Sequence, residues 1–205
     1  MSKKEPTIDI ICVLDRSGSM SSLAGEVINS YNNFLQDQRT EKGKARVTLV
    51  LFDDKYEVVY ERVKLKKVPE LTPKVYFARG MTSLYDAIGK TISDDRFKDT
   101  KDAIVLIQTD GYENSSQEFK KEDIKQLVKE KEALGWDFQF LGANIDAMAV
   151  GQGFGLSTDK IMQYQATNSG VRDAHMSMSA VSKAYRRSKI QEFNSSVNPN
   201  KKEEK

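Results

Sequence analysis

The sequence is short of cysteine: its 205 residues include one, Cys12, which lies inside an apolar run. A lone cysteine cannot form an internal disulfide, so the chain is not a disulfide-stabilised scaffold, and we expect this thiol to be inert packing. Long apolar segments are also missing, because none approaches the roughly 18 residues of a membrane span. The N-terminal stretch MSKKEPTIDI holds no apolar region of the length found in signal peptides. We therefore expect a cytoplasmic protein with no membrane partner.

An excess of one charge is absent as well. The 32 lysines and arginines nearly cancel the 30 aspartates and glutamates, which leaves a net charge of +2. This balance gives no support for nucleic acid or a membrane surface as the partner. With 39% hydrophobic and 30% charged residues, the composition is that of a globular protein with a full core. We expect one domain over residues 1–192 and a disordered polar tail over residues 193–205.

Strand-like apolar runs alternate with helical patterns along the chain. Strands are predicted over residues 7–14, 46–52, 56–63, 103–109, 137–142 and 161–165. The first amphipathic helix is predicted over residues 21–39, and the last carries Val171, Ala174, Met178, Val181 and Tyr185. The alternation predicts an α/β fold with an open, doubly wound and mostly parallel sheet. The turn at residues 53–55 predicts an antiparallel strand, 56–63, at the sheet edge.

The first strand ends on a carboxylate. In the stretch IICVLDRSGSM, residues 10–20, Asp15 follows the apolar run, and Ser17 and Ser19 come at steps of two after it. Alternate side chains of an extended loop point to the same side, so these three residues can direct their oxygens at one point. Gly18 allows the backbone to turn and to approach closely.

Two further oxygen donors stand at other junctions between strands and helices. Asp110 follows the strand 103–109, and Thr82 precedes a helix in ARGMTSLYDAI. Ligands of doubly wound sheets bind at the carboxyl ends of the strands, where Asp15 and Asp110 are both expected. Two carboxylates and three hydroxyls suit a hard divalent cation such as Mg²⁺, and these loops offer no sulfur or imidazole to a softer metal.

Each signal also has a simpler interpretation. A serine pair or a threonine before a helix commonly caps the helix N-terminus, and Asp110-Gly111 commonly forms a turn. For Ser17, Ser19 or Thr82 alone, capping is the more frequent role. The three signals together, in this order and each at a junction of strand and helix, favour a metal site.

Together these residues resemble the metal-ion-dependent adhesion site of the von Willebrand factor A domain. The motif of that family is Asp-x-Ser-x-Ser, then a threonine in a later loop, then an aspartate after the next central strand. The matching residues are Asp15, Ser17, Ser19, Thr82 and Asp110. The flanking segments GMTSLYDAI and LIQTDGYEN also look like the family, and the resemblance covers about residues 7–190. It implies a Rossmann-like fold with one antiparallel edge strand and a bound Mg²⁺ or Mn²⁺ ion.

The resemblance implies a binding module and not an enzyme. Neutral hydroxyl ligands leave most of the charge on the cation, which would recruit an exposed aspartate or glutamate of a protein partner. The chain looks most like the stand-alone members found in bacteria and their phages, and so implies the cytoplasm of a bacterial host. One departure is that Gly111 is followed by Tyr112 and only then by Glu113, where the family often has a Gly-acidic pair. For Glu113 there are two interpretations, a residue that orders this loop or lies near the site and a solvated surface residue, and we expect the second.

Two other functions stay open. With Asp15 as a nucleophile, the chain would be a Mg²⁺-dependent phosphohydrolase on a similar fold. The haloacid dehalogenase family would, however, need a second acid where Ser17 stands. The domain would be a structural or assembly subunit if it self-associated, with Glu203 or Glu204 of the tail serving the metal of a neighbouring copy.

Three other polar positions are assigned structural roles. His175, the single histidine, is expected on the surface or at the boundary of the last helix. Arg16 occupies a variable position of the motif and is expected on the surface, either plainly solvated or facing an acidic partner. Arg186 belongs to a basic stretch that is expected to complement the dipole at the end of the last helix.

Overall fold

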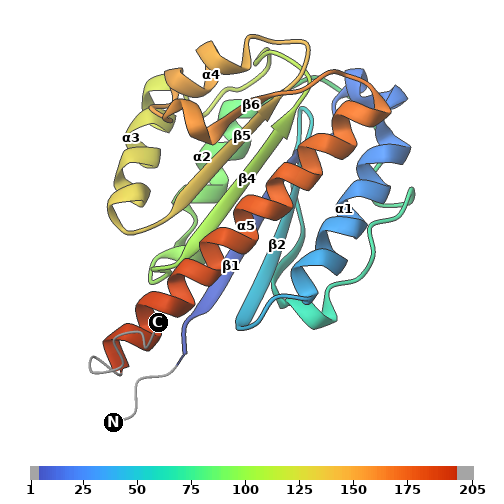
Figure 1. Ribbon diagram of the computed structural model, residues 1–205. Coiled ribbons are helices and arrows are strands. Elements are labelled where there is room, and N and C mark those ends of the chain that lie inside the picture. The colour runs from blue at the N-terminus through green and yellow to red at the C-terminus, as the bar shows by residue number, and fades with distance from the viewer. Residues whose placement is uncertain (1–4, 198–205) are drawn as a thin grey trace.

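A six-stranded sheet forms the centre of the structure, a computed structural model that describes residues 5–197. The strands lie in the order β3-β2-β1-β4-β5-β6 (Figure 1). They span Thr7–Asp15 (β1), Lys44–Phe52 (β2), Tyr56–Lys64 (β3), Ala103–Thr109 (β4), Asp137–Gly142 (β5) and Ile161–Gln163 (β6). Every neighbouring pair is parallel except β2 and β3. The predicted fold class, a Rossmann-like α/β sheet with one antiparallel edge strand, is confirmed.

Helices cover both faces of the sheet. They span Ala24–Arg39 (α1), Leu84–Ser93 (α2), Lys121–Ala133 (α3), Ala147–Gly153 (α4) and Asn168–Val197 (α5). Helices α1 and α5 lie side by side on one face, and α5 runs over the sheet from one end of the strands to the other (Figure 1). Helices α2, α3 and α4 contribute to a second core on the opposite face. Short 3₁₀ turns lie at Gly18–Ser22 (η1), Leu65–Lys67 (η2), Asp95–Phe97 (η3) and Thr158–Lys160 (η4).

Strand β1 is buried on both sides because helices cover both faces of the sheet. Ile10, Cys12 and Leu14 belong to the core under α1 and α5, whereas Ile11 and Val13 belong to the core under α2, α3 and α4. Burial raises the pKa of the Cys12 thiol to about 12. The thiol therefore stays protonated and packs inside the core, as the sequence predicts.

The carboxyl ends of the central strands meet at one edge of the sheet. Asp15, the last residue of β1, lies beside Phe52, the last residue of β2. On the other side of β1, Leu14 lies beside Gln108, one residue before the end of β4. The loops that leave β1, β2 and β4 therefore begin next to one another.

Helix α5 is longer than the sequence predicts. It continues to Val197, so residues 193–197, whose polar composition predicts a disordered tail, are helical. These last turns are mostly exposed, so they carry little of the apolar periodicity that identifies a helix. The rest of that tail, residues 198–205 with Glu203 and Glu204, lies outside the described residues. Within residues 5–197, no helix is both long and apolar enough to cross a membrane.

His175 of α5 is buried against the sheet, so the surface or boundary position predicted for it is wrong. Its exposed fraction is 3%, and its Nε2 lies 2.9 Å from Oε1 of Gln108 in β4. The other ring nitrogen, Nδ1, has no hydrogen-bond partner among the described residues. His175 directly follows Ala174 on the packed face of α5, a place that apolar periodicity alone does not assign to a histidine.

Arg186 is also buried and does not complement the dipole of its own helix, which continues well beyond it. Its guanidinium donates to the main-chain oxygen of Gln38, at 2.7 Å, and to those of Glu41, Lys42 and Gly43. These carbonyls stand at or just after the C-terminal end of α1. Arg186 therefore fixes α5 to the end of α1.

The burial of His175 makes stability depend on pH. Burial lowers the pKa of His175 to about 4, with the charge of Glu26 opposing this shift. A histidine in an unfolded chain titrates near 6.5, so between these values the unfolded state binds a proton that the folded state does not. As the pH falls through this window, the folded state should lose about 3 kcal/mol of stability.

The measurement is chemical denaturation of the natural protein and of His175→Gln at pH 7 and pH 4. The difference between the two proteins in the stability lost from pH 7 to pH 4 cancels the contribution of the other titrating groups. The natural protein should lose more stability than the variant does. Equal losses would show that His175 does not hold an unprotonated ring in the fold.

Candidate metal site

Asp15 is fixed at the end of β1 by three hydrogen bonds. Its Oδ1 accepts from the main-chain N–H of Ser17 at 2.6 Å, and its Oδ2 accepts from Oγ1 of Thr109 at 2.6 Å. Its main-chain oxygen accepts from the hydroxyl of Tyr76 at 2.6 Å. The side chain is fully buried. Thr109, which aligns this carboxylate from the end of β4, is a residue that the sequence pattern does not identify.

Ser19 contacts Asp110 of the loop after β4, and Ser17 contacts Ser19. The two serine hydroxyls lie 3.1 Å apart, and the hydroxyl of Ser19 donates to Oδ1 of Asp110 at 2.5 Å. Ser17 precedes η1, but its side chain makes no capping hydrogen bond. The capping interpretation of Ser17 is therefore wrong, and the serine pair joins the loop after β1 to the loop after β4.

Thr82 lies beside the same cluster. A Cβ atom placed on Gly111 would lie 3.1 Å from Oγ1 of Thr82 and 3.7 Å from Oγ of Ser19. Both hydroxyls therefore border one small space that is open because residue 111 has no side chain. The residue at the N-cap of α2 is Ser83 and not Thr82. The main chain of Thr82 is held by Asn114, whose Oδ1 accepts from its N–H at 2.9 Å.

The oxygen cluster contains no histidine or cysteine and only two acidic side chains, although these are the residues that most metal sites use. No group of three or more histidines, cysteines, aspartates or glutamates within residues 5–197 is arranged to hold a metal ion. The cluster has two carboxylates, from Asp15 and Asp110, and otherwise hydroxyls. Such an all-oxygen set is suited to a hard cation that keeps water or a partner's oxygen among its ligands.

Burial disfavours the charged form of both carboxyl groups of the cluster. Burial raises the pKa of Asp15 to about 6; hydrogen bonds from Thr109 and Ser17 oppose this shift, and the charge of Asp110 adds to it. Burial also raises the pKa of Asp110, with the hydrogen bond from Ser19 opposing. Two desolvated carboxylates near each other are stabilised by a cation placed between them.

Arg16 does not supply that positive charge, because its side chain points to the turn between β2 and β3. It is 1% exposed, so the surface position predicted for it is wrong. Its Nε donates to Oδ2 of Asp53 at 2.9 Å, and its Nη2 donates to Glu57 at 2.7 Å. Arg79 donates to the same Oδ2 of Asp53 at 2.7 Å. Asp53, which reads as a turn residue in the sequence, thus binds two arginines from two loops.

Main-chain hydrogen bonds hold residues 79–83 against the loop after β1 and against the turn between β2 and β3. The N–H of Arg79 donates to the oxygen of Arg16 at 2.8 Å, and the N–H of Gly18 donates to the oxygen of Gly80 at 3.2 Å. The N–H of Ser83 donates to the oxygen of Asp53 at 2.9 Å. Gly80 has a φ of +67°, a left-handed conformation in which any other side chain is strained, so the main chain here favours glycine.

Glu113 orders the loop after β4, and the prediction of a solvated surface residue is wrong. Its Oε1 accepts from the N–H groups of Ser115 and Ser116 at 2.9 and 2.6 Å. Its Oε2 accepts from the N–H of Tyr85, in the first turn of α2, at 2.9 Å. Glu113 therefore ties the loop that carries Asp110 to the helix that follows Thr82.

Several solved structures share this architecture. Proximal thread matrix protein 1 of the mussel byssus, in a structure with a zinc-occupied MIDAS motif, matches with a TM-score of 0.65 and 15% identity, over 87% of this chain and 46% of that one. The PilB minor pilin of Streptococcus sanguinis matches with a TM-score of 0.64 and 10% identity, over 89% of this chain and 63% of that one. The VWA domain of SpRpn10 matches with a TM-score of 0.58 and 10% identity, over 81% of this chain and 92% of that one.

These likenesses define the fold. A doubly wound sheet with its polar cluster at the carboxyl edge places the chain among the Rossmann-like α/β proteins. Within that class, the chain has the von Willebrand factor A fold, as the sequence motif predicts. It spans less than two thirds of the matrix protein and of the pilin. No protein-family model matches the chain, and no curated protein matches its sequence.

The loops around the cluster should depend on Asp53. Asp53→Ala would leave the buried guanidinium of Arg16 without its buried partner, so we expect the free energy of unfolding to fall by about 3 kcal/mol. Glu57→Ala is the matched control, because Glu57 binds the same arginine but is 48% exposed. That variant should lose less than about 1 kcal/mol. Urea denaturation measures both, and similar losses would contradict the role given to Asp53.

Proposed function

We propose that the chain is a divalent-cation-dependent protein-binding module. Asp15, Ser17, Ser19, Thr82 and Asp110 would hold the cation, Mg²⁺ or Mn²⁺. The observation that carries the proposal is the hydrogen bond between Ser19 and Asp110, which joins two loops 91 residues apart in the sequence. The adjacent space beside Gly111, bordered by the hydroxyl of Thr82, supports it.

The chemistry of the donors favours a hard cation. All side chains of the proposed site offer oxygen, which Mg²⁺ and Mn²⁺ prefer, and none offers the sulfur or imidazole that zinc usually takes. The zinc-occupied motif of the mussel matrix protein supports a metal at this position of the fold. A bound cation supplies positive charge for a carboxylate of a partner. This chain's own residues hold the two carboxylates in place: the hydroxyl of Thr109 donates to Asp15, and the hydroxyl of Ser19 donates to Asp110.

The nearest enzymatic alternative has less support. A phosphohydrolase would use Asp15 as the nucleophile, and the haloacid dehalogenase type would need a second acid two residues further on, where this chain has Ser17. The hydroxyl of Ser17 lies 3.1 Å from that of Ser19, and a hydroxyl there does not do the acid–base work of a carboxyl group. The resemblance of the five residues to an adhesion-site motif implies a binding module, which agrees with the proposal.

Self-association and cellular location stay predictions. The glutamates proposed to reach a neighbouring metal, Glu203 and Glu204, lie outside the described residues. A measurement of mass in solution, with Mg²⁺ and again with EDTA, separates an assembly subunit from a monomer. The cytoplasm of a bacterial host is the location that the sequence predicts.

Mg²⁺ should stabilise the folded chain. At a concentration ten times the dissociation constant, binding adds about 1.4 kcal/mol, which raises Tm by roughly 3–6 °C for a chain of this size. Ser19→Ala and Thr82→Val should lose this increase while keeping their Tm in EDTA within about 2 °C of the natural protein. Ser21→Ala is the control: it removes an exposed hydroxyl two residues after Ser19 and should keep the increase in Tm. The same Tm in Mg²⁺, Mn²⁺ and EDTA would contradict the proposal.

Filling the space beside Gly111 should weaken the binding of Mg²⁺. A methyl group there would lie 3.1 Å from Oγ1 of Thr82, so Gly111→Ala should lower Mg²⁺ affinity by about tenfold, or about 1.4 kcal/mol. Isothermal titration of the full chain with Mg²⁺ measures this change. Gly25→Ala is the control, because a Cβ at Gly25 meets no atom within 4 Å. Unchanged affinity in Gly111→Ala would move the proposed cation away from this space.

A further inference from the structure

Large apolar side chains gather around the proposed metal site. Seven large hydrophobic side chains are exposed within residues 5–197, and three of them, Phe77, Met81 and Tyr112, lie on the loops around the oxygen cluster. They are 44%, 52% and 57% exposed. Met81 directly precedes Thr82, and Tyr112 directly follows Gly111. Single exposed apolar side chains are ordinary, but a group around one site marks an interaction surface. We call these three residues the apolar rim.

Two arginines hold Phe77 in place beside the loop that follows β1. The guanidinium carbon of Arg79 lies 5.0 Å from the centre of the ring, and that of Arg16 lies 5.7 Å from it. Both arginines are themselves fixed by Asp53. The ring is therefore presented to solvent in a fixed position, which lowers the entropy cost of binding against it.

A hollow opens on the other side of the rim, beside Tyr112. Its volume is about 220 Å³, and its lining includes Tyr85, Lys121, Val150 and Phe154. The hydroxyl of Tyr112 accepts from the N–H of Asp146 at 3.0 Å, which keeps the ring between the oxygen cluster and the hollow.

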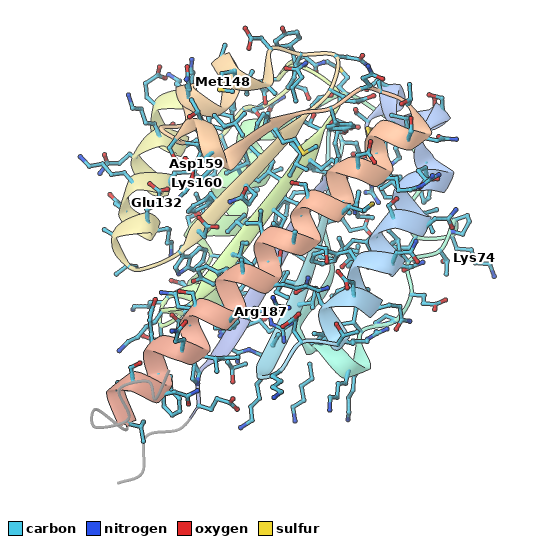
Figure 2. The ribbon with its side chains drawn as sticks, in the orientation of Figure 1. Lys74, Glu132, Met148, Asp159, Lys160 and Arg187 are labelled. Atoms are coloured by element: carbon cyan, nitrogen blue, oxygen red, sulfur yellow. The ribbon has the colours of Figure 1, made fainter. Side chains whose placement is uncertain are left out.

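Helix α4 extends this apolar surface. Met148, in its first turn, is 38% exposed and lies at the upper end of the molecule (Figure 2). The surface around the oxygen cluster therefore offers apolar contacts on the loop before α2, on the loop after β4 and on α4.

We infer that the partner presents a short segment in which the acidic residue is flanked by large apolar side chains. The carboxylate is drawn to the cation, so the inference rests on the proposed function. The flanking side chains pack on the apolar rim, and one of them enters the hollow beside Tyr112. Arg79 is already paired with Asp53 and Glu57, and Lys121 shares the lining of the hollow with Asp146. The side chains around the proposed cation therefore offer apolar contact without an excess of charge, which suits a segment with one acidic residue and apolar flanks.

The test uses two synthetic hexapeptides with the full chain. One peptide has a single aspartate flanked by a phenylalanine and a leucine, and the other has the same aspartate flanked by glycines. In Mg²⁺ the first should bind about tenfold more tightly than the second, as measured by fluorescence anisotropy, and EDTA should abolish both. Equal affinity of the two peptides in Mg²⁺ would overturn the inference and leave the proposed function standing.

Variants of the rim locate the contact. The double variant Met81→Ser with Tyr112→Ser should bind the two peptides equally, and Tyr112→Phe should keep most of the preference because it keeps the ring. The matched control is Leu134→Ser with Met176→Ser, which removes two side chains of similar exposure, 55% at the end of α3 and 65% on α5. The control should keep the tenfold preference, and a loss there as large as in the rim variant would overturn the inference.

The rise in Tm with Mg²⁺ separates the two proposals. In the rim variant it should match that of the natural protein, because the rim supplies no ligand to the cation. If neither peptide binds, the inference is overturned. The proposed function fails with it only if Mg²⁺ also leaves the Tm unchanged.

Discussion

A buried carboxylate, that of Asp53, holds together the loops on which the candidate site depends. Burial alone would raise the pKa of Asp53, but hydrogen bonds from Arg79, from the main chain of Lys55 and from Arg16 outweigh it and lower the pKa. The ion pairs stand at the edge of the sheet, where loops have no strand neighbours to bind their backbone groups. A buried ion pair of this kind contributes little net stability, but removing one partner costs several kcal/mol. Its value to the fold is the fixed position of two loops.

The carboxylates at this edge fall into two electrostatic classes. Asp53 is paired with two arginines, and its pKa is lowered. Within residues 5–197, Asp15 and Asp110 accept hydrogen bonds only from hydroxyls and from backbone N–H groups, and their pKa values are raised. In this part of the chain, one carboxylate is thus paired with the protein's own cations and the two others have no cationic partner. This difference is what a cation from solution would relieve, and it separates the structural part of the edge from the part proposed to bind.

The sequence predicts the sheet and the position of the oxygen cluster because both depend on short-range patterns. Apolar runs identify the strands, and the ends of parallel strands meet at one edge, so Asp15 and Asp110 can be placed together without coordinates. Arg16, Glu113 and His175 are misassigned because their burial depends on which loop or helix packs against them. A charged or polar side chain carries no periodic signal that reports such a partner. The role of the five residues as ligands of a metal stays a prediction.

Recognition through a cation alone would be unselective. Every protein surface offers aspartates and glutamates, and a divalent ion distinguishes poorly among them, because each presents the same carboxylate group to the cation. Selectivity must then come from groups next to the cation that favour one acid over the others. Exposed apolar side chains cost solubility, and a chain that keeps Phe77, Met81 and Tyr112 around one site accepts that cost there. In the proposed module the rim and the cation would therefore have separable tasks: the charge would draw any carboxylate, and the apolar surface would determine which carboxylate stays.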